Sequence, residues 1–148
     1  MQYLRGTIDI ILTLEADNLH RHRWYVDAAF AVHEDMKSHT GGTLTLGKGA
    51  IVSICSGQKL NTRSSTEAEL VGVDDCMCKV LWLRYFMEAQ GYPPEDVVVY
   101  QDNKSAILLE ENGRASIGRR TRFIKLRYFF ITDRIKANEV RVEYCASD

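Results

Sequence analysis

The stretch Val97-Val98-Val99-Tyr100-Gln101-Asp102-Asn103 decides the fold of this chain. Its first four residues are a continuous β-rich run of the kind found in strands that are buried on both faces. The run passes through Asp102-Asn103 directly into a helical pattern over 104–111. A strand that leads straight into a helix suits a parallel sheet, and such sheets carry their sites in the crevice beyond the strand ends.

Toward the N-terminus, the pattern predicts three antiparallel strands followed by a long helix. Strand-like runs cover 23–30, 42–46 and 50–55, and Gly47-Lys48-Gly49 suits a hairpin turn between the last two. The helix is expected over 64–90 with a stop at Gly91. One apolar stripe along it is formed by Leu70, Val73, Met77, Val80, Leu81 and Met87.

Toward the C-terminus, a basic amphipathic segment over 121–138 predicts another helix, and the alternating residues 140–144 predict a last strand. The order of elements is βββαβαβ or a close variant. This order predicts an α/β fold with a mixed five-stranded sheet, in which three antiparallel strands are followed by parallel strands and helices flank the sheet.

The 148 residues fit one compact domain without a flexible linker. Residues 7–14 look like a strand and 15–22 are polar, so 1–22 are expected to be an appended edge segment before a main domain over 23–148. No run approaches the roughly 20 apolar residues that span a bilayer, and the N-terminus lacks the apolar core of a secretion signal. Nothing in the sequence points to secretion or to a membrane.

Two aspartates stand out against this background. Asp27 lies in the apolar run 25–30, where a carboxylate is costly to bury unless a metal ion or hydrogen bonds compensate it. Asp102, taken alone, is explained by a turn or helix-capping role beside Asn103. The two aspartates taken together favour a shared site.

A third acid comes from the helix start Ser64-Ser65-Thr66-Glu67-Ala68-Glu69, although both glutamates there also match the spacing of a capping box. Glu69 shares a helical face with Val73, Cys76 and Val80 and should point toward the sheet, whereas Glu67 projects elsewhere. Glu69 is therefore the predicted ligand and Glu67 the predicted cap.

Several motifs resemble the ribonuclease H domain of Ty1/copia-type retrotransposon polyproteins. They are Tyr25-Val26-Asp27-Ala28, Lys37-Ser38-His39-Thr40-Gly41, the helix start over 64–69, Trp82-Leu83-Arg84 and the stretch over 101–107. The resemblance runs in order from about Trp24 to Asp148. In addition, residues 3–7 are similar to the stretch that follows the reverse transcriptase in the same polyproteins.

The resemblance implies a metal-dependent endonuclease that hydrolyses the RNA strand of RNA–DNA hybrids during reverse transcription. It places Asp27, Glu69 and Asp102 on three of the family's four catalytic acids. Asp27 would bridge two Mg²⁺ or Mn²⁺ ions, and the other two acids would each help to hold one. The implied partners are the hybrid and the reverse transcriptase of the same polyprotein, in the cytoplasm or within virus-like particles.

The sequence departs from the family pattern at four places. Ala29 stands where a second aspartate is usual, residues 120–125 read Arg-Thr-Arg-Phe-Ile-Lys instead of Arg-Thr-Lys-His-Ile-Asp, and Phe129 replaces a common histidine. The family's fourth acid follows several residues beyond Asp148. The resemblance therefore implies a C-terminally truncated domain that binds hybrid but cuts it weakly until the chain is extended through the next aspartate.

The net charge of −1 gives no general attraction to nucleic acid, so contact with phosphates needs a local basic patch. A patch lies over 114–136, where the predicted nucleic-acid contacts are Arg119, Arg120, Arg122, Lys125 and Arg127. A solvated helix face is the alternative explanation of the same residues. The four cysteines lack zinc-site spacing and are expected to be reduced structural thiols, and the four histidines are expected in exposed loops.

Two other functions remain open. One is a non-catalytic nucleic-acid-binding or scaffolding module with a decayed or incomplete site, which would bind without metal and without cleavage. The other keeps the fold but acts on duplex DNA, as integrases and resolvases do, and would cut or join DNA strands.

Overall fold

A computed structural model describes residues 5–112 and 122–146, without the side chains of 122–126 and 128. Its main sheet begins with three antiparallel strands, β2 (Arg21–Ala29), β3 (His39–Thr45) and β5 (Val52–Gly57). The next two strands, β6 (Asp96–Gln101) and β7 (Arg141–Tyr144), are parallel to β2. The strand order is β5-β3-β2-β6-β7, which confirms the predicted mixed five-stranded sheet.

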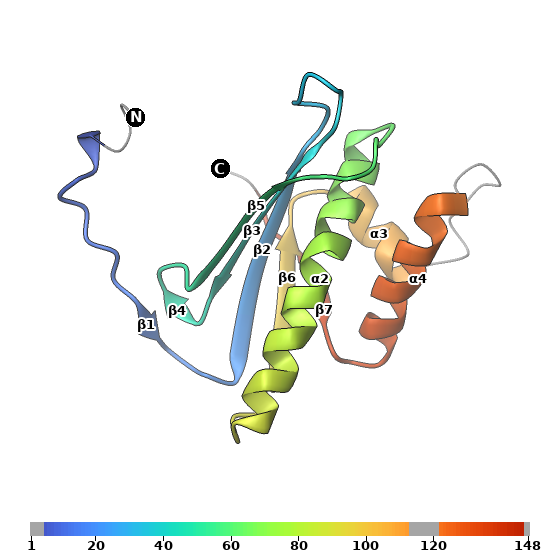
Figure 1. Ribbon diagram of the computed structural model, residues 1–148. Coiled ribbons are helices and arrows are strands. Elements are labelled where there is room, and N and C mark those ends of the chain that lie inside the picture. Colours follow the sequence, from blue (N-terminus) through green and yellow to red (C-terminus); the bar gives the residue numbers. More distant parts are fainter. Residues whose placement is uncertain (1–4, 113–121, 147–148) are drawn as a thin grey trace.

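Three helices lie together on one side of this sheet (Figure 1): α2 (Ser65–Ala89), α3 (Lys104–Asn112) and α4 (Arg122–Lys136). The alternation of a strand explains which face they cover, because successive side chains point to opposite faces. In β2 the even-numbered side chains, such as Trp24 and Val26, are buried beneath the helices, while the odd-numbered ones are not. None of the described helices is long and apolar enough to cross a membrane.

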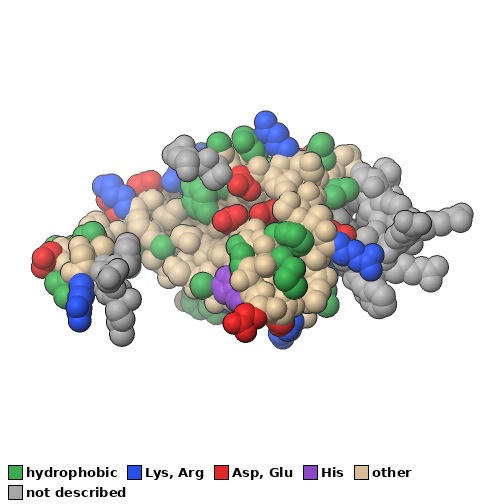
Figure 2. All heavy atoms as spheres, turned by 90° about the horizontal axis from the view of Figure 1, so that it is seen from above, with side chains coloured by type: hydrophobic (Ala, Val, Ile, Leu, Met, Phe, Trp, Pro, Cys, Tyr) green, Lys and Arg blue, Asp and Glu red, His purple; other side chains and the backbone are tan. Residues whose placement is uncertain are grey.

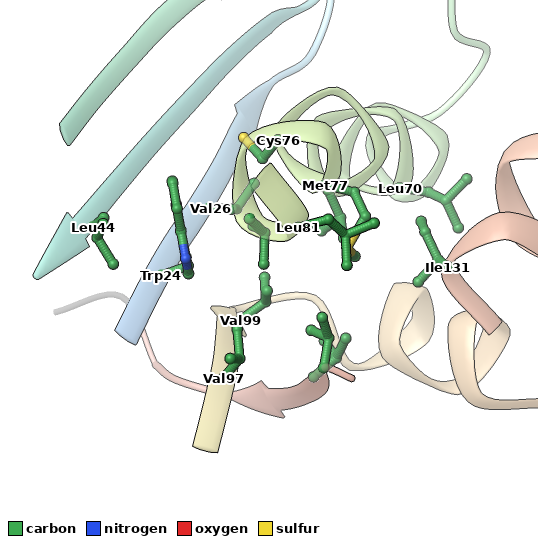
Figure 3. Close-up of a cluster of buried hydrophobic side chains, with 14 of the residues drawn as sticks. Trp24, Val26, Leu44, Leu70, Cys76, Met77, Leu81, Val97, Val99 and Ile131 are labelled. Carbon is green, nitrogen blue, oxygen red and sulfur yellow. The ribbon is translucent and has the colours of Figure 1, made fainter. Parts of the chain in front are cut away.

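The hydrophobic core fills the space between the sheet and α2 (Figure 3). Close packing of such side chains is the main stabilising contribution in a domain of this size. Its labelled members come from three strands and two helices and are Trp24, Val26, Leu44, Leu70, Cys76, Met77, Leu81, Val97, Val99 and Ile131. The predicted apolar stripe of α2 is therefore the face that contacts the sheet.

Both ends of α2 form as their residue types predict. At the start, the Ser64 hydroxyl accepts a hydrogen bond of 3.2 Å from the Glu67 N–H, and the Glu67 carboxylate accepts one of 2.7 Å from the Arg63 N–H. At the end, Gly91 has φ +86°, a conformation that glycine adopts without strain. The capping role of Glu67 and the stop at Gly91 are confirmed.

The prediction of a strand over 7–14 is wrong. Thr7 accepts a turn hydrogen bond from Ile10, and the chain then runs irregularly to a short strand, β1 (Glu15–Ala16). β1 pairs with β4 (Gly47–Lys48), so the predicted turn, which does join the antiparallel strands β3 and β5, also carries a strand of a second, two-stranded sheet. Apolar residues alone do not make a strand, because its backbone groups need a pairing partner. The division of the chain at residue 23 stays a prediction.

Candidate metal centre

The parallel register of β2 and β6 brings two aspartates to one edge of the sheet. Tyr25 lies opposite Tyr100, and their rings stack with centroids 5.1 Å apart. Because the side-chain period of a strand is two, Asp27 follows Tyr25 on the same face of β2, and Asp102, two residues after Tyr100, lies just beyond the end of β6. An open hollow on this face, about 400 Å³ in volume, gives solvent access to both aspartates.

Asp102 is not the cap of α3. The side-chain oxygen of Asn103 accepts hydrogen bonds of 3.1 Å from the N–H groups of both Ser105 and Ala106, which is the pattern of an N-cap residue. The capping role thus belongs to Asn103, and the carboxylate of Asp102 points into the cluster with Asp27. The helix-capping interpretation of Asp102 is therefore wrong.

Glu69 completes the cluster from the second turn of α2. Its side chain is only 5% exposed, and one of its carboxylate oxygens accepts a hydrogen bond of 3.3 Å from the Ala28 N–H. Asp27, Glu69 and Asp102 each offer a carboxylate oxygen, and these oxygens all lie within 4.8 Å of one another. Figure 2, which looks onto this edge, shows acidic side chains grouped near its middle. The predicted convergence of the three acids is confirmed.

The electrostatics of the cluster favour a cation. Burial, followed by the negative charge of Asp27, raises the pKa of the Glu69 carboxyl to about 7. Its second carboxylate oxygen is buried and has no hydrogen-bond partner. A divalent ion would supply both the missing charge and the missing partner, and hard carboxylate oxygens are the ligands that Mg²⁺ takes. The three residues therefore fit a metal site.

A second buried glutamate, which sequence reasoning missed, lies behind the cluster. Glu110 of α3 is fully buried, and its carboxyl accepts a hydrogen bond of 2.7 Å from the side-chain amide of Gln101, the residue before Asp102. The Thr132 hydroxyl donates a bond of 2.7 Å to the Glu110 backbone carbonyl and so ties α4 to α3. A signal existed, because Glu110 lies four residues beyond Ala106 on the buried face of its helix.

Two plant proteins are similar to almost the whole chain. The retrovirus-related Pol polyprotein from transposon TNT 1-94 of Nicotiana tabacum is 33% identical over 144 residues, which cover 96% of this chain and 10% of the polyprotein. The chain is a homologue of retrotransposon Pol polyproteins. The Pol polyprotein from transposon RE2 of Arabidopsis thaliana is 30% identical over 152 residues, with 99% of this chain and again 10% of the polyprotein covered. This Pol homologue thus spans a tenth of the length of these relatives.

Solved structures show the fold of the Pol homologue. LC11-RNase H1, in a complex with RNA/DNA hybrid, superposes with a TM-score of 0.59 at 12% identity, covering 84% of this chain and 85% of that one. The protease–reverse transcriptase of prototype foamy virus gives 0.58 at 11% identity, covering 84% of this chain and 17% of that one. No protein-family model matches the chain. The ribonuclease H fold predicted from the sequence motifs is confirmed.

Of the five basic residues predicted to contact nucleic acid, the structure describes only some. Arg119 and Arg120 lie outside the described residues, and so do the side chains of Arg122 and Lys125 on α4. Arg127 forms ion pairs with Asp74 at 2.7 Å and Asp75 at 3.0 Å, so its charge is matched by two acids of α2. The binding of nucleic acid by all five cations stays a prediction.

The expectations for histidine and cysteine hold only in part. His22 is fully buried in β2, where burial lowers the pKa of its imidazole, and it is therefore no exposed loop residue. All four cysteines are free, as predicted, but only Cys76 is buried, so a structural role fits Cys76 alone. A strand places alternate residues inside whatever their polarity, and sequence inspection assigned His22 to a loop because the strand begins earlier than predicted.

Proposed function

We propose that this domain is a metal-dependent endonuclease of a Ty1/copia-type retrotransposon that hydrolyses the RNA strand of RNA–DNA hybrids. The observation that carries the proposal is the convergence of Asp27, Glu69 and Asp102 at one edge of a ribonuclease H fold. Homology to retrotransposon Pol polyproteins supports a role in reverse transcription. The proposed reaction class is phosphodiester hydrolysis.

The carboxylates of Asp27, Glu69 and Asp102 would hold Mg²⁺ or Mn²⁺, most simply as two ions. Such ions supply a nucleophile at neutral pH and stabilise the leaving oxygen of the phosphodiester. The chain's own part is to fix the ligands before substrate arrives. The Ala28 N–H holds one oxygen of Glu69, and Asn103 fixes the backbone beside Asp102 by capping α3. Preorganised ligands lower the cost of binding the ions in one defined arrangement.

The proposed substrate is recognised by shape. An RNA–DNA hybrid differs from duplex DNA in its groove geometry and in the 2′-hydroxyl groups of one strand, which a protein reads without reading bases. LC11-RNase H1 has been solved with such a hybrid, and the foamy virus protein carries the fold beside a reverse transcriptase. These structures support the hybrid and a reverse transcriptase of the same polyprotein as partners. We further propose that the domain acts inside the cell, in the cytoplasm or in virus-like particles.

The decisive experiment incubates the chain with an end-labelled RNA–DNA hybrid and separates the products on a denaturing gel. Mg²⁺, Mn²⁺ and a chelator are compared, with duplex DNA and duplex RNA as alternative substrates. Cleavage of the RNA strand that needs metal and disappears in Asp27→Asn supports the proposal. Hybrid binding without metal and without cleavage, also in a chain extended through the next aspartate, would favour a binding module. Cutting of duplex DNA would favour an integrase-like or resolvase-like activity.

A separate experiment tests the basic segment. Changing Arg120 and Arg122 to alanine should weaken hybrid binding about equally for all sequences and reduce its salt dependence, because phosphate contacts carry no base identity. Fluorescence anisotropy at several salt concentrations measures both effects. An unchanged salt slope would return these residues to the solvated-face interpretation.

A further inference from the structure

A cysteine and two histidines form a hydrogen-bonded row on β3, β5 and the loop before β3, apart from the acid cluster. A ring nitrogen of His33 lies 2.9 Å from Nδ1 of His39, and Nε2 of His39 lies 3.1 Å from the Cys55 sulfur. The strand register explains the second contact. Gly41 pairs with Cys55 and His39 pairs with Gly57, so His39 and Cys55 are diagonal neighbours on one sheet face.

The three side chains are arranged so that a proton can move from the Cys55 thiol to His39. A neutral imidazole carries one N–H, so the tautomer of His39 that donates from Nδ1 to His33 leaves Nε2 as an acceptor. That acceptor faces the thiol of Cys55. A nucleophile, a base beside it and a third group that orients the base are the arrangement that activates a weak nucleophile.

The outer end of the row, at His33, lies beside a charged pair. His33 is exposed to solvent, and the nearby charged pair is Asp35 with Lys37, whose carboxylate and ammonium lie 2.5 Å apart. A hydrogen bond from Lys37 is the main cause that lowers the pKa of Asp35, and the charge of His33 acts in the same direction. The outer end of the row is therefore open to water and close to an ion pair.

The other thiols provide a comparison within the same molecule. Cys76 is buried against the sheet, and burial raises the pKa of its thiol to about 12. Cys78 and Cys145 are exposed, as Cys55 is, but among the described residues neither makes a hydrogen bond to a histidine. Exposure is thus shared by three thiols, and contact with an imidazole distinguishes one of them.

We propose that Cys55 is a thiol-exchange site, at which His39 acts as the base and His33 orients it, and that its co-reactants are low-molecular-weight disulfides. The Cys55 sulfur attacks one sulfur of the disulfide, a new S–S bond forms and the old one breaks. The thiol proton moves to His39 and then to the departing thiolate, so one thiol and one disulfide yield one mixed disulfide and one thiol. This proposal does not rest on the proposed hydrolysis of RNA.

The experiment compares single exposed thiols in the intact chain, using 5,5′-dithiobis(2-nitrobenzoic acid) as the probe. One variant keeps Cys55 and carries C78S and C145S, and two matched variants keep only Cys78 or only Cys145 among the exposed thiols. The release of coloured thiolate near pH 7 gives each second-order rate. We expect Cys55 to react at least about tenfold faster than the other two, since a positioned base typically contributes roughly a hundredfold or more.

Histidine variants then separate activation from simple exposure. In the chain that keeps Cys55, His39→Gln should lower the rate to that of Cys78, and His33→Gln should lower it severalfold. Circular dichroism and the melting temperature check that each variant is folded, and His20→Gln is the matched control. A Cys55 rate no greater than that of Cys78, or one unchanged by His39→Gln in a folded variant, would overturn the proposal.

Discussion

Two buried glutamates in this molecule have opposite surroundings. Glu69 lies at the open edge of the sheet with two other carboxylates, while Glu110 lies in the closed interior behind that edge with the amide of Gln101. Burial is the largest cause that raises the pKa of both carboxyls. The partners differ, because Glu69 adds to a cluster of negative charge and Glu110 accepts a hydrogen bond from a neutral amide.

This difference in partners indicates what each glutamate can do. A carboxyl that shares its site with like charges gains from any cation, so it is suited to hold a metal ion. A carboxyl that is kept neutral and hydrogen-bonded fixes its surroundings, because breaking the bond would leave a buried polar group without a partner. Glu69 is thus poised for a ligand, and Glu110 holds in place the strand end that carries Asp102.

The largest effect is expected at the open edge. Asp102→Asn removes one charged ligand and should lower hybrid cleavage by at least about a hundredfold, because the ions contribute several kcal/mol to the stabilisation of the transition state. The fold should remain, and the melting temperature without metal should be equal or higher, since repulsion is relieved. Gel assays and thermal unfolding measure these effects, with Glu111→Gln as a control. Cleavage at the unmodified rate would remove Asp102 from the site.

The closed interior should respond in stability. Glu110→Ala leaves a cavity and an unpartnered Gln101 amide, which should cost roughly 2 to 4 kcal/mol of the free energy of unfolding. Glu110→Gln keeps the shape and an oxygen acceptor, and its cost should stay within about 1 kcal/mol if the native carboxyl is neutral. Urea unfolding followed by circular dichroism distinguishes the two variants. Equal losses would mean that the charge of Glu110, rather than its shape, is needed.

The pH dependence of stability tests the protonation of Glu69. The pKa of Glu69 is 4.5 in the unfolded chain and about 7 in the folded one, so the folded state binds the proton more tightly. The stability from this group is complete below pH 4.5 and is lost as the pH rises to about 7, with a total of up to about 3 kcal/mol. Glu110 contributes with the same sign.

Urea unfolding from pH 4.5 to 8 without divalent ions measures this loss. Glu69→Gln should remove the part of the pH dependence of the unfolding free energy that comes from Glu69. Mg²⁺ should restore stability near pH 7.5 in the unmodified chain but not in the variant. An identical pH dependence in the chain and in Glu69→Gln would show that the proton of Glu69 is not linked to folding.

The smallest effect concerns the tie between α3 and α4. Thr132→Val removes the hydroxyl that donates to the Glu110 carbonyl while keeping the volume of the side chain, so about 1 kcal/mol of stability should be lost. Cleavage of the hybrid should change little, because the Thr132 hydroxyl bonds to the backbone of Glu110, which is not one of the three clustered acids. Unfolding in urea and the gel assay test both halves of this expectation. A large loss of cleavage would extend the metal centre into the interior.

Much of the fold follows from patterns within single elements. The run 97–100 and the helix start at Ser64 carry their periods and their cap in the sequence, and the structure forms both as predicted. Residues 7–14 carry an apolar pattern too, but a strand needs a partner, and no local pattern says whether one is present. The pairing of β1 with β4 is of this non-local kind.

The candidate site shows the same limit. Asp27 could be predicted because it is an acid in an otherwise apolar run, although its side chain is exposed, and Glu69 because it is an acid on the buried face of its helix. Asp102 could not be separated from a helix cap until the structure gave that role to Asn103. Glu110 was not predicted, because its partner Gln101 lies on another element and only folding brings the two side chains together.

The parallel pairing of β2 with β6 also affects the order of events during folding. It joins segments that lie far apart in the chain, with α2 between them, and contacts of this kind form late because closing a long loop is entropically costly. The acid cluster therefore exists only after this step, and partly folded chains offer divalent ions no assembled ligands. We expect these ions to slow unfolding of the finished domain while leaving its folding rate nearly unchanged.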